Sequence, residues 1–197
     1  MDIFVARQPI LSRGKKTYGY ELLFRDGLTN SFPEIDGETA SSKVLTNSFF
    51  SIGMDQLVLE KKAFINFTQG LLTKKIPMMF PKEKIVIEIL EDVEPTEEVI
   101  AACRVMASSG YEIALDDFVY DKKLEPLIEM ANLIKFDFRL TPRDQIKAAL
   151  GDLSRNRRLK FLAEKKVNNL SLEKDIVPRC YMEAVGWADA LALTAMS

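Results

Sequence analysis

The order of apolar segments constrains the fold of this 197-residue chain more than any other feature. Short runs rich in Ile, Val, Phe and Tyr, which are typical of buried strands, alternate with longer amphipathic stretches, which are typical of helices. Because strands that alternate with helices usually pair in parallel through helical crossovers, this order predicts an α/β fold. The segments that indicate strands are Ile3–Ile10, Thr17–Phe24, Ala63–Phe67, Lys84–Leu90, Glu112–Phe118, Asn132–Phe138 and Leu159–Ala163.

Four segments are expected to form helices. Pro95–Ser109 begins with a proline and two acids and stops at Gly110, as helices commonly do. Thr141 is expected to cap a helix that has Pro142 in its first turn. Residues 12–16 separate the first two strands and suit a hairpin turn. The expected helices are Glu38–Ile52, Pro95–Ser109, Leu124–Met130 and Thr141–Leu150.

Polar or charged residues stand within or directly after six of the expected strands. A charged residue in a buried strand is costly unless it is paired or bound to a metal. In a closed barrel the carboxyl ends of parallel strands meet at one face, so these side chains are expected to converge there. They are Glu21, Asn66, Glu88, Asp116 with Asp117, Lys135, and Glu164.

The converging groups suggest a chemistry. Their oxygen atoms suit Mg²⁺ or Mn²⁺ better than zinc, and two successive aspartates suit a pair of ions that hydrolyses a phosphate ester. Lys135 would hold a phosphate oxygen or orient the attacking water. Simpler interpretations stay open for each residue alone: an acid can mark an exposed strand end, Asp117 can cap a turn, and Lys135 can pair with Asp137 or Glu88.

Composition narrows the function further. The chain has no histidine, which excludes Ser-His-Asp catalysis and histidine-ligated metal sites. Its net charge of −2 argues against a nucleic-acid-binding protein. There is neither a signal peptide nor an apolar run of about 18 residues, so we expect no membrane association. Cys103 and Cys180 have no CxxC partner and are expected to be free thiols of a cytoplasmic protein.

The same residues carry a family resemblance. Gly19-Tyr20-Glu21-Leu22-Leu23-Phe24-Arg25 resembles the signature that names the EAL domains, which are bacterial cyclic-di-GMP phosphodiesterases. Residues 5–11, 18–25 and 114–120 most resemble EAL domains that precede an HDOD domain. Further family motifs follow in the expected order over residues 3–164: Gln8-Pro9-Ile10, Ile65-Asn66-Phe67-Thr68, Ile87–Glu91, Leu115-Asp116-Asp117-Phe118, Ile134–Asp137 and Leu162-Ala163-Glu164.

The resemblance implies a TIM-like (β/α) barrel that hydrolyses cyclic di-GMP to linear pGpG with Mg²⁺ or Mn²⁺, as a two-metal site. It implies that Lys135 helps to position the nucleophilic water, and that Glu21 and Glu164 are the other catalytic residues. The implied dinucleotide contacts are Gln8, Leu23 and Arg25, whose guanidinium suits a phosphate. The implied metal ligands are Glu21, Asn66, Glu88, Asp116, Asp117 and Glu164.

The chain also departs from the family pattern. The loop after Asp117, residues 119–123, lacks the usual glycines; Glu164 is followed by Lys165 instead of a Gly-Val-Glu sequence; and the closing QG strand is missing. Barrels of this type usually need about 250 residues, so we expect this one to be short by about a strand and a helix at its C-terminus.

We expect residues 1–168 to form the barrel domain and 169–197 a divergent segment that packs on it or on a partner. That segment is expected to hold a strand at Asp175–Val177 and a helix at Met182–Met196. An incomplete barrel would leave apolar surface, which favours a homodimer or a partner domain.

The resemblance and the departures from it leave two functions open. The chain is expected to be a phosphodiesterase, or alternatively a catalytically inactive EAL-like module that binds cyclic di-GMP or a protein. Glycoside hydrolysis by paired carboxylates explains neither Asn66 nor Lys135.

Overall fold

The fold is that of a computed structural model, which describes residues 4–12, 16–25, 53–137, 140–164, 180–183 and 189–191. Two predicted elements, the helix Glu38–Ile52 and the strand Asp175–Val177, lie outside these residues. Within them, nine strands form one sheet. Its members are β1 (Phe4–Leu11), β2 (Thr17–Arg25), β3 (Lys62–Phe67), β4 (Ile85–Ile89), β5 (Glu112–Leu115), β6 (Leu133–Asp137), β7 (Lys160–Glu164), β8 (Cys180–Glu183) and β9 (Asp189–Leu191).

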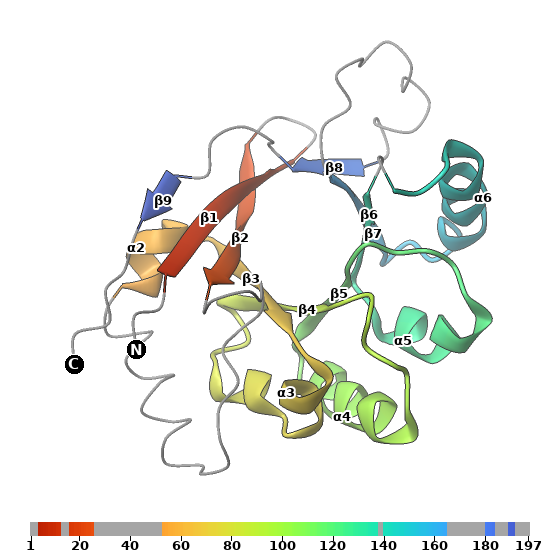
Figure 1. Ribbon diagram of the computed structural model, residues 1–197, viewed down its shortest axis with the longest axis horizontal. Coiled ribbons are helices and arrows are strands. Elements are labelled where there is room, and N and C mark those ends of the chain that lie inside the picture. Colours follow the sequence, from red (N-terminus) through yellow and green to blue (C-terminus); the bar gives the residue numbers. More distant parts are fainter. Residues whose placement is uncertain are drawn as a thin grey trace.

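The sheet closes on itself as a barrel. β1 and β2 form the expected antiparallel hairpin, and each strand from β2 to β7 is parallel to the strand that follows it. β8 then pairs with β1 in the antiparallel direction, so that β1 to β8 form a ring (Figure 1). β9 adds a further antiparallel pairing along β1. The predicted TIM-like α/β barrel is therefore confirmed, but the expectation that it lacks a closing strand is corrected, because β8 pairs with both β7 and β1.

Helices lie outside the ring of strands (Figure 1). None of those in the described residues is long and apolar enough to cross a membrane. The helices are α2 (Met54–Val58), α3 (Gln69–Thr73), α4 (Glu97–Ser108), α5 (Glu125–Met130) and α6 (Arg143–Leu153), with the 3₁₀ turns η1 (Ile76–Met79) and η2 (Lys122–Leu124).

The end of α4 confirms the predicted stop at Gly110, whereas its start at Glu97 lies two residues after the predicted start at Pro95. Thr96 caps α4 by accepting a hydrogen bond of 3.3 Å from the Val99 amide, and Gly110 follows the helix with φ = +93°. The predicted start of α6 is wrong by two residues. Pro142 is the residue that precedes α6, without a side-chain cap, and the amide of Thr141 bonds back to the Asp137 carbonyl at 2.9 Å.

Two further predictions are corrected. The helix expected at Met182–Met196 is wrong, because the described residues there belong to β8 and β9. Its Ala- and Leu-rich composition favours a helix, but the unpaired backbone groups of β7 and β1 at the closing position favour strand pairing. The strand expected to end at Phe118 ends at Leu115, so Asp116 and Asp117 follow β5 instead of lying within it.

A small apolar layer fills the barrel below the carboxyl ends of its strands. It consists of Ile10, Phe64, Val86, Ala114, Leu133 and Leu162. Strand side chains alternate between the two faces, so the residue two positions further along lies on the same face. Asn66, Glu88 and Lys135 each follow a member of this layer by two positions. The apolar layer therefore forms the floor of a polar site.

Candidate metal centre

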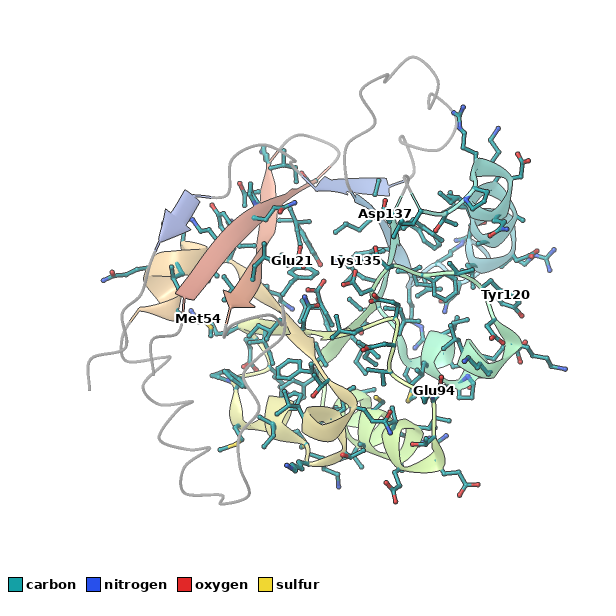
Figure 2. All side chains as sticks on the ribbon, in the orientation of Figure 1. Glu21, Met54, Glu94, Tyr120, Lys135 and Asp137 are labelled. Carbon is teal, nitrogen blue, oxygen red and sulfur yellow. The ribbon has the colours of Figure 1, made fainter. Side chains whose placement is uncertain are left out.

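The parallel register brings the predicted polar residues to one level of the barrel. Asn66 on β3 is the register partner of Glu88 on β4, and Gln8 on β1 is the partner of Glu21 on β2. Figure 2 shows Glu21 and Lys135 pointing into the ring of strands. The exposed fractions of Glu21, Asn66, Glu88 and Lys135 are all 6% or less, so the site is almost closed to bulk water.

Lys135 lies at the centre of this site. Its Nζ is 2.8 Å from Glu88 Oε1, 2.9 Å from Asp116 Oδ1 and 3.7 Å from Glu21 Oε1. Asn66 Nδ2 donates a longer hydrogen bond, of 3.4 Å, to Glu21 Oε1. Five of the residues predicted from the sequence are therefore brought together by five different strands or strand ends. The simpler interpretation offered Asp137 and Glu88 as ion-pair partners of Lys135, and the structure shows the ion pair with Glu88.

The cluster carries an excess of buried negative charge. One ammonium faces three carboxylates, and Glu88 is fully buried. Desolvation raises the pKa of Glu88 well above its ordinary value, Lys135 opposes that rise, and the charges of Glu21 and Asp116 add to it. Either a proton on Glu88 or a bound cation balances such a charge.

Two more predicted ligands occupy neighbouring positions. The amide of Asp117 donates a hydrogen bond of 3.0 Å to Asp116 Oδ1, and Asp117 has a left-handed backbone with φ = +38°. Glu164 ends β7 as the register partner of Asp137 at the end of β6. The side chain of Glu164 lies outside the described residues.

The three residues expected to contact a dinucleotide belong to the β1–β2 hairpin. Gln8 and Leu23 are half-buried, and Leu23 follows Glu21 by two positions, which puts both side chains on one face of β2. Arg25 is the last residue of β2 and the register partner of Phe4. The side chain of Arg25 is not among those that the structure describes.

The donor set fits a hard divalent cation. Its oxygen atoms come from carboxylates and an amide, and Glu88 Oε2 is buried without a hydrogen-bond partner in the described part of the chain. Among the described side chains, however, no three or more Asp, Glu or Cys residues are arranged as a metal cluster. The ammonium of Lys135 lies among the carboxylates instead. A cation would therefore have to displace at least one contact of Lys135.

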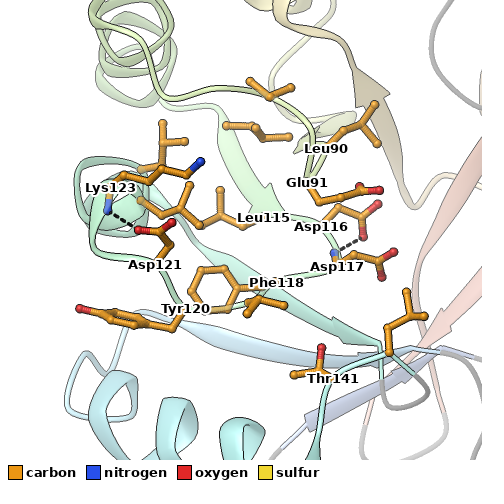
Figure 3. Close-up of a pocket in the computed structure, with 16 residues that line it drawn as sticks. Leu90, Glu91, Leu115, Asp116, Asp117, Phe118, Tyr120, Asp121, Lys123 and Thr141 are labelled. Atoms are coloured by element: carbon orange, nitrogen blue, oxygen red, sulfur yellow. Dashed lines mark hydrogen bonds between the residues drawn. The ribbon is translucent and has the colours of Figure 1, made fainter.

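A cavity of about 460 Å³ adjoins the centre (Figure 3). Its walls come from the segments that follow β4, β5 and β6, and include Asp116, Asp117 and Phe118. The loop that lacks the family's glycines forms one side of it. Between Phe118 and Lys123 no residue has a positive φ, so this loop does not need glycine; instead, Asp121 Oδ1 accepts a hydrogen bond of 3.0 Å from the Lys123 amide.

Sequence reasoning missed two buried residues here. Asp137, which is 1% exposed, belongs to a family motif and was offered as an ion-pair partner of Lys135, but it was not included among the site residues, although it follows Lys135 by two positions and shares its face of β6. Figure 2 shows it within the ring of strands. Phe118 was predicted as the last residue of a strand, and its contacts depend on the tertiary structure, so no sequence pattern could have found them.

Comparisons with known proteins agree with this geometry. Over 164 residues the chain is 38% identical to the cyclic di-GMP phosphodiesterase CdgJ of Vibrio cholerae, a match that covers 82% of this chain and 38% of CdgJ. It is also 38% identical over 170 residues to the uncharacterized protein YuxH of Bacillus subtilis, covering 84% of this chain and 41% of YuxH. No protein-family model matches the chain.

Among solved structures, the fold resembles that of Bacillus subtilis YkuI, a protein with an EAL domain, in complex with its substrate cyclic di-GMP and calcium. The TM-score is 0.67 with 20% identity, and the match covers 98% of this chain and 56% of YkuI. The chain has the fold of an EAL domain. It spans about two fifths of the length of the two curated relatives.

Proposed function

We propose that this EAL domain is a metal-dependent phosphodiesterase that hydrolyses cyclic di-GMP to linear pGpG. The observation that carries the proposal is the excess of buried carboxylates around Lys135, at the barrel face where enzymes of this fold bind substrates. CdgJ, which is 38% identical, is a cyclic di-GMP phosphodiesterase, and YkuI binds cyclic di-GMP together with calcium.

Divalent cations, Mg²⁺ or Mn²⁺, would be held by carboxylate and amide oxygens at the carboxyl ends of the strands. Such cations supply charge neutralisation for the phosphate and activation of a water molecule. Glu88 is suited to this role because its Oε2 is buried without a hydrogen-bond partner in the described residues. The proposed ligands are Glu21, Asn66, Glu88, Asp116, Asp117 and Glu164.

The organic groups of the chain would perform the remaining tasks. Lys135, released from part of its ion pairing, would donate hydrogen bonds to the attacking water or to a phosphate oxygen. Gln8, Leu23 and Arg25 would hold the dinucleotide across the β1–β2 hairpin, with the guanidinium of Arg25 on a phosphate. Glu21 and Glu164 would complete the catalytic set beside Lys135.

The test is turnover of cyclic di-GMP by the pure protein with Mn²⁺, compared with a Glu21→Gln variant. Glu21 lies 3.7 Å from Lys135 and accepts the Asn66 hydrogen bond, and the isosteric amide removes its negative charge while preserving its shape. The proposal expects linear product from the wild-type protein and a loss of about 100-fold in the variant. Equal rates in the two proteins would overturn it.

A second candidate is a catalytically inactive module that binds cyclic di-GMP or another protein. It is favoured by the direct ion pairs of Lys135 with Glu88 and Asp116, which occupy groups that an active centre needs. Calorimetry with cyclic di-GMP separates its two forms. Binding without turnover supports the dinucleotide-binding form, and the absence of binding leaves only the protein-interaction form.

We also infer association with a second copy of the chain or with a partner domain, in the cytoplasm. Three large apolar side chains are exposed beside the cavity, Val119 and Tyr120 at 52% each and Leu140 at 70%, which supports a covered surface. Sedimentation velocity tests the homodimer directly.

The proposed cytoplasmic location rests on the buried free thiol of Cys103, which suits a reducing compartment.

A further inference from the structure

The segment that follows β5 is fixed at one buried residue. Between Leu115 and Leu127, Phe118 is the only residue classed as buried, with 2% of its surface exposed. Its neighbours Val119 and Tyr120 are both 52% exposed. Among the residues that follow Asp117 in this segment, Phe118 is therefore the one that is packed into the interior.

The backbone of Phe118 connects this segment to β6. Its amide donates a hydrogen bond of 2.8 Å to the carbonyl of Lys135. Lys135 in turn contacts Asp116 Oδ1 through its side chain, at 2.9 Å. Asp117 thus lies between two links to the same residue of β6: a backbone link on one side and an ion pair on the other.

Asp117 needs such restraint because its backbone conformation is disfavoured. Its φ of +38° lies in the left-handed region, which side chains other than glycine adopt reluctantly. Asp116 is held to β4 by a hydrogen bond of 2.9 Å from its amide to the Ile89 carbonyl. The turn would relax unless both of its ends were held.

The ring of Phe118 supplies the second half of the restraint. It packs edge-on against Phe136, with ring centroids 5.8 Å apart and planes at 81°, and Phe136 stacks on Phe161 of β7. Phe136 directly follows Lys135, so its side chain lies on the opposite face of β6. The ring therefore holds the turn from the helix-covered side of the barrel, next to the cavity of Figure 3.

We propose that Phe118 is a positioning residue, which fixes the carboxylates of Asp116 and Asp117 for metal binding by anchoring their turn to β6. This inference rests on the proposed metal site. Groups that orient the ligands of a metal typically contribute about 10- to 100-fold to its affinity.

The experiment measures Mn²⁺ affinity by calorimetry and stability by urea unfolding, in the wild-type protein and in two variants, Phe118→Leu and Phe80→Leu. Phe80 is the matched control, because it is also 2% exposed and also packs edge-on, against Phe67. We expect both variants to lose similar stability. Only Phe118→Leu should weaken Mn²⁺ binding, by about 10-fold or more.

Equal Mn²⁺ affinity in Phe118→Leu and the wild-type protein overturns the positioning role and leaves the proposed function standing. Absence of Mn²⁺ binding by the wild-type protein overturns both. If Phe118→Leu does not fold, Phe118→Met, which keeps most of the side-chain volume, replaces it. Hydrogen exchange of the wild-type protein adds an independent check: the Phe118 amide must be protected as strongly as those of β6, and rapid exchange contradicts the anchor.

Discussion

Lys135 is the residue on which the centre depends most. It is fully buried, and it forms close ion pairs with Glu88 and Asp116, which are themselves acidic and poorly exposed. Removing one partner of a buried ion pair leaves the charge of the other without compensation, which is more costly than losing an exposed pair. The stability of the metal-free protein should therefore depend on this one ammonium.

We predict that Lys135→Met lowers the free energy of unfolding of the metal-free protein by about 3–5 kcal/mol, because the buried carboxylates of Glu21 and Glu88 and the partly buried carboxylate of Asp116 lose their cation. Mn²⁺ should restore more stability to this variant than to the wild-type protein. Urea unfolding with and without Mn²⁺ measures both effects. Lys123→Met is the control, because Lys123 forms an exposed ion pair with Glu94 at 3.3 Å; its midpoint should hardly change. A variant as stable as the wild-type protein would contradict the charge argument.

Cys103 allows a second prediction at this scale. Its side chain is fully buried, and burial raises the pKa of the thiol to about 12. At pH 8 the thiolate fraction should be about 1000-fold lower than for an ordinary thiol, in addition to the steric protection. In a Cys180→Ser variant, a disulfide reagent should therefore react with Cys103 only after the protein is denatured. Rapid reaction of the native variant would show that the thiol is accessible.

At the scale of single elements, β2 must pass very close to β3. A Cβ atom placed on Gly19 would lie 2.7 Å from Cε2 of Phe64 and 2.9 Å from the Lys62 carbonyl oxygen. Phe64 belongs to the apolar layer under the candidate centre, so its displacement would disturb the floor of the site. Only glycine fits at this position without movement of its neighbours.

We predict that Gly19→Ala lowers stability by about 1–3 kcal/mol, because overpacking forces Phe64 or the backbone to shift. Gly151→Ala is a matched control in α6: it is exposed, and a Cβ there would meet nothing within 4 Å. The control should raise stability by about 0.5–1 kcal/mol, since alanine favours a helix over glycine. Thermal unfolding of both variants checks the sign of each change; destabilisation in both would refute the packing explanation.

Local sequence signals predicted the elements that depend on local interactions. The strands β1 to β7 and the helix α4 with its stop before Gly110 follow from apolar periodicity and from the residues typical of helix ends. β8 and β9 do not, because Cys180–Glu183 becomes a strand only through pairing with β7 and β1, which are far away in the sequence. Likewise, the recurrence of polar residues predicted the convergence of Glu21, Glu88 and Lys135, but their ion pairs and the role of Phe118 arise from tertiary packing.

At the scale of the whole molecule, the barrel is closed by a strand of only four residues. β8 has two register partners on β1 and three on β7, whereas β9 pairs with β1 alone. β8 is expected to contribute more to cooperative folding than β9, because β8 joins the two ends of the ring.

The division of the chain at residue 168 stays a prediction, as does an association with an HDOD domain.

We predict that removal of residues 189–197 leaves a cooperatively folded barrel, whereas removal of residues 180–197 exposes the edges of β7 and β1 and broadens the unfolding transition. Circular dichroism during urea unfolding compares the two truncations with the full chain. Identical transitions for both truncations would show that β8 does not close the barrel in solution.

We propose that the carboxylates around Lys135 hold divalent cations and that these cations make the domain a phosphodiesterase. The most direct test is a titration of cyclic di-GMP turnover with Mn²⁺, starting from protein treated with a chelator. The proposal predicts no linear product without metal and a rate that rises to saturation as Mn²⁺ is added. A complete absence of product at every Mn²⁺ concentration, from a protein shown to be folded, would contradict it.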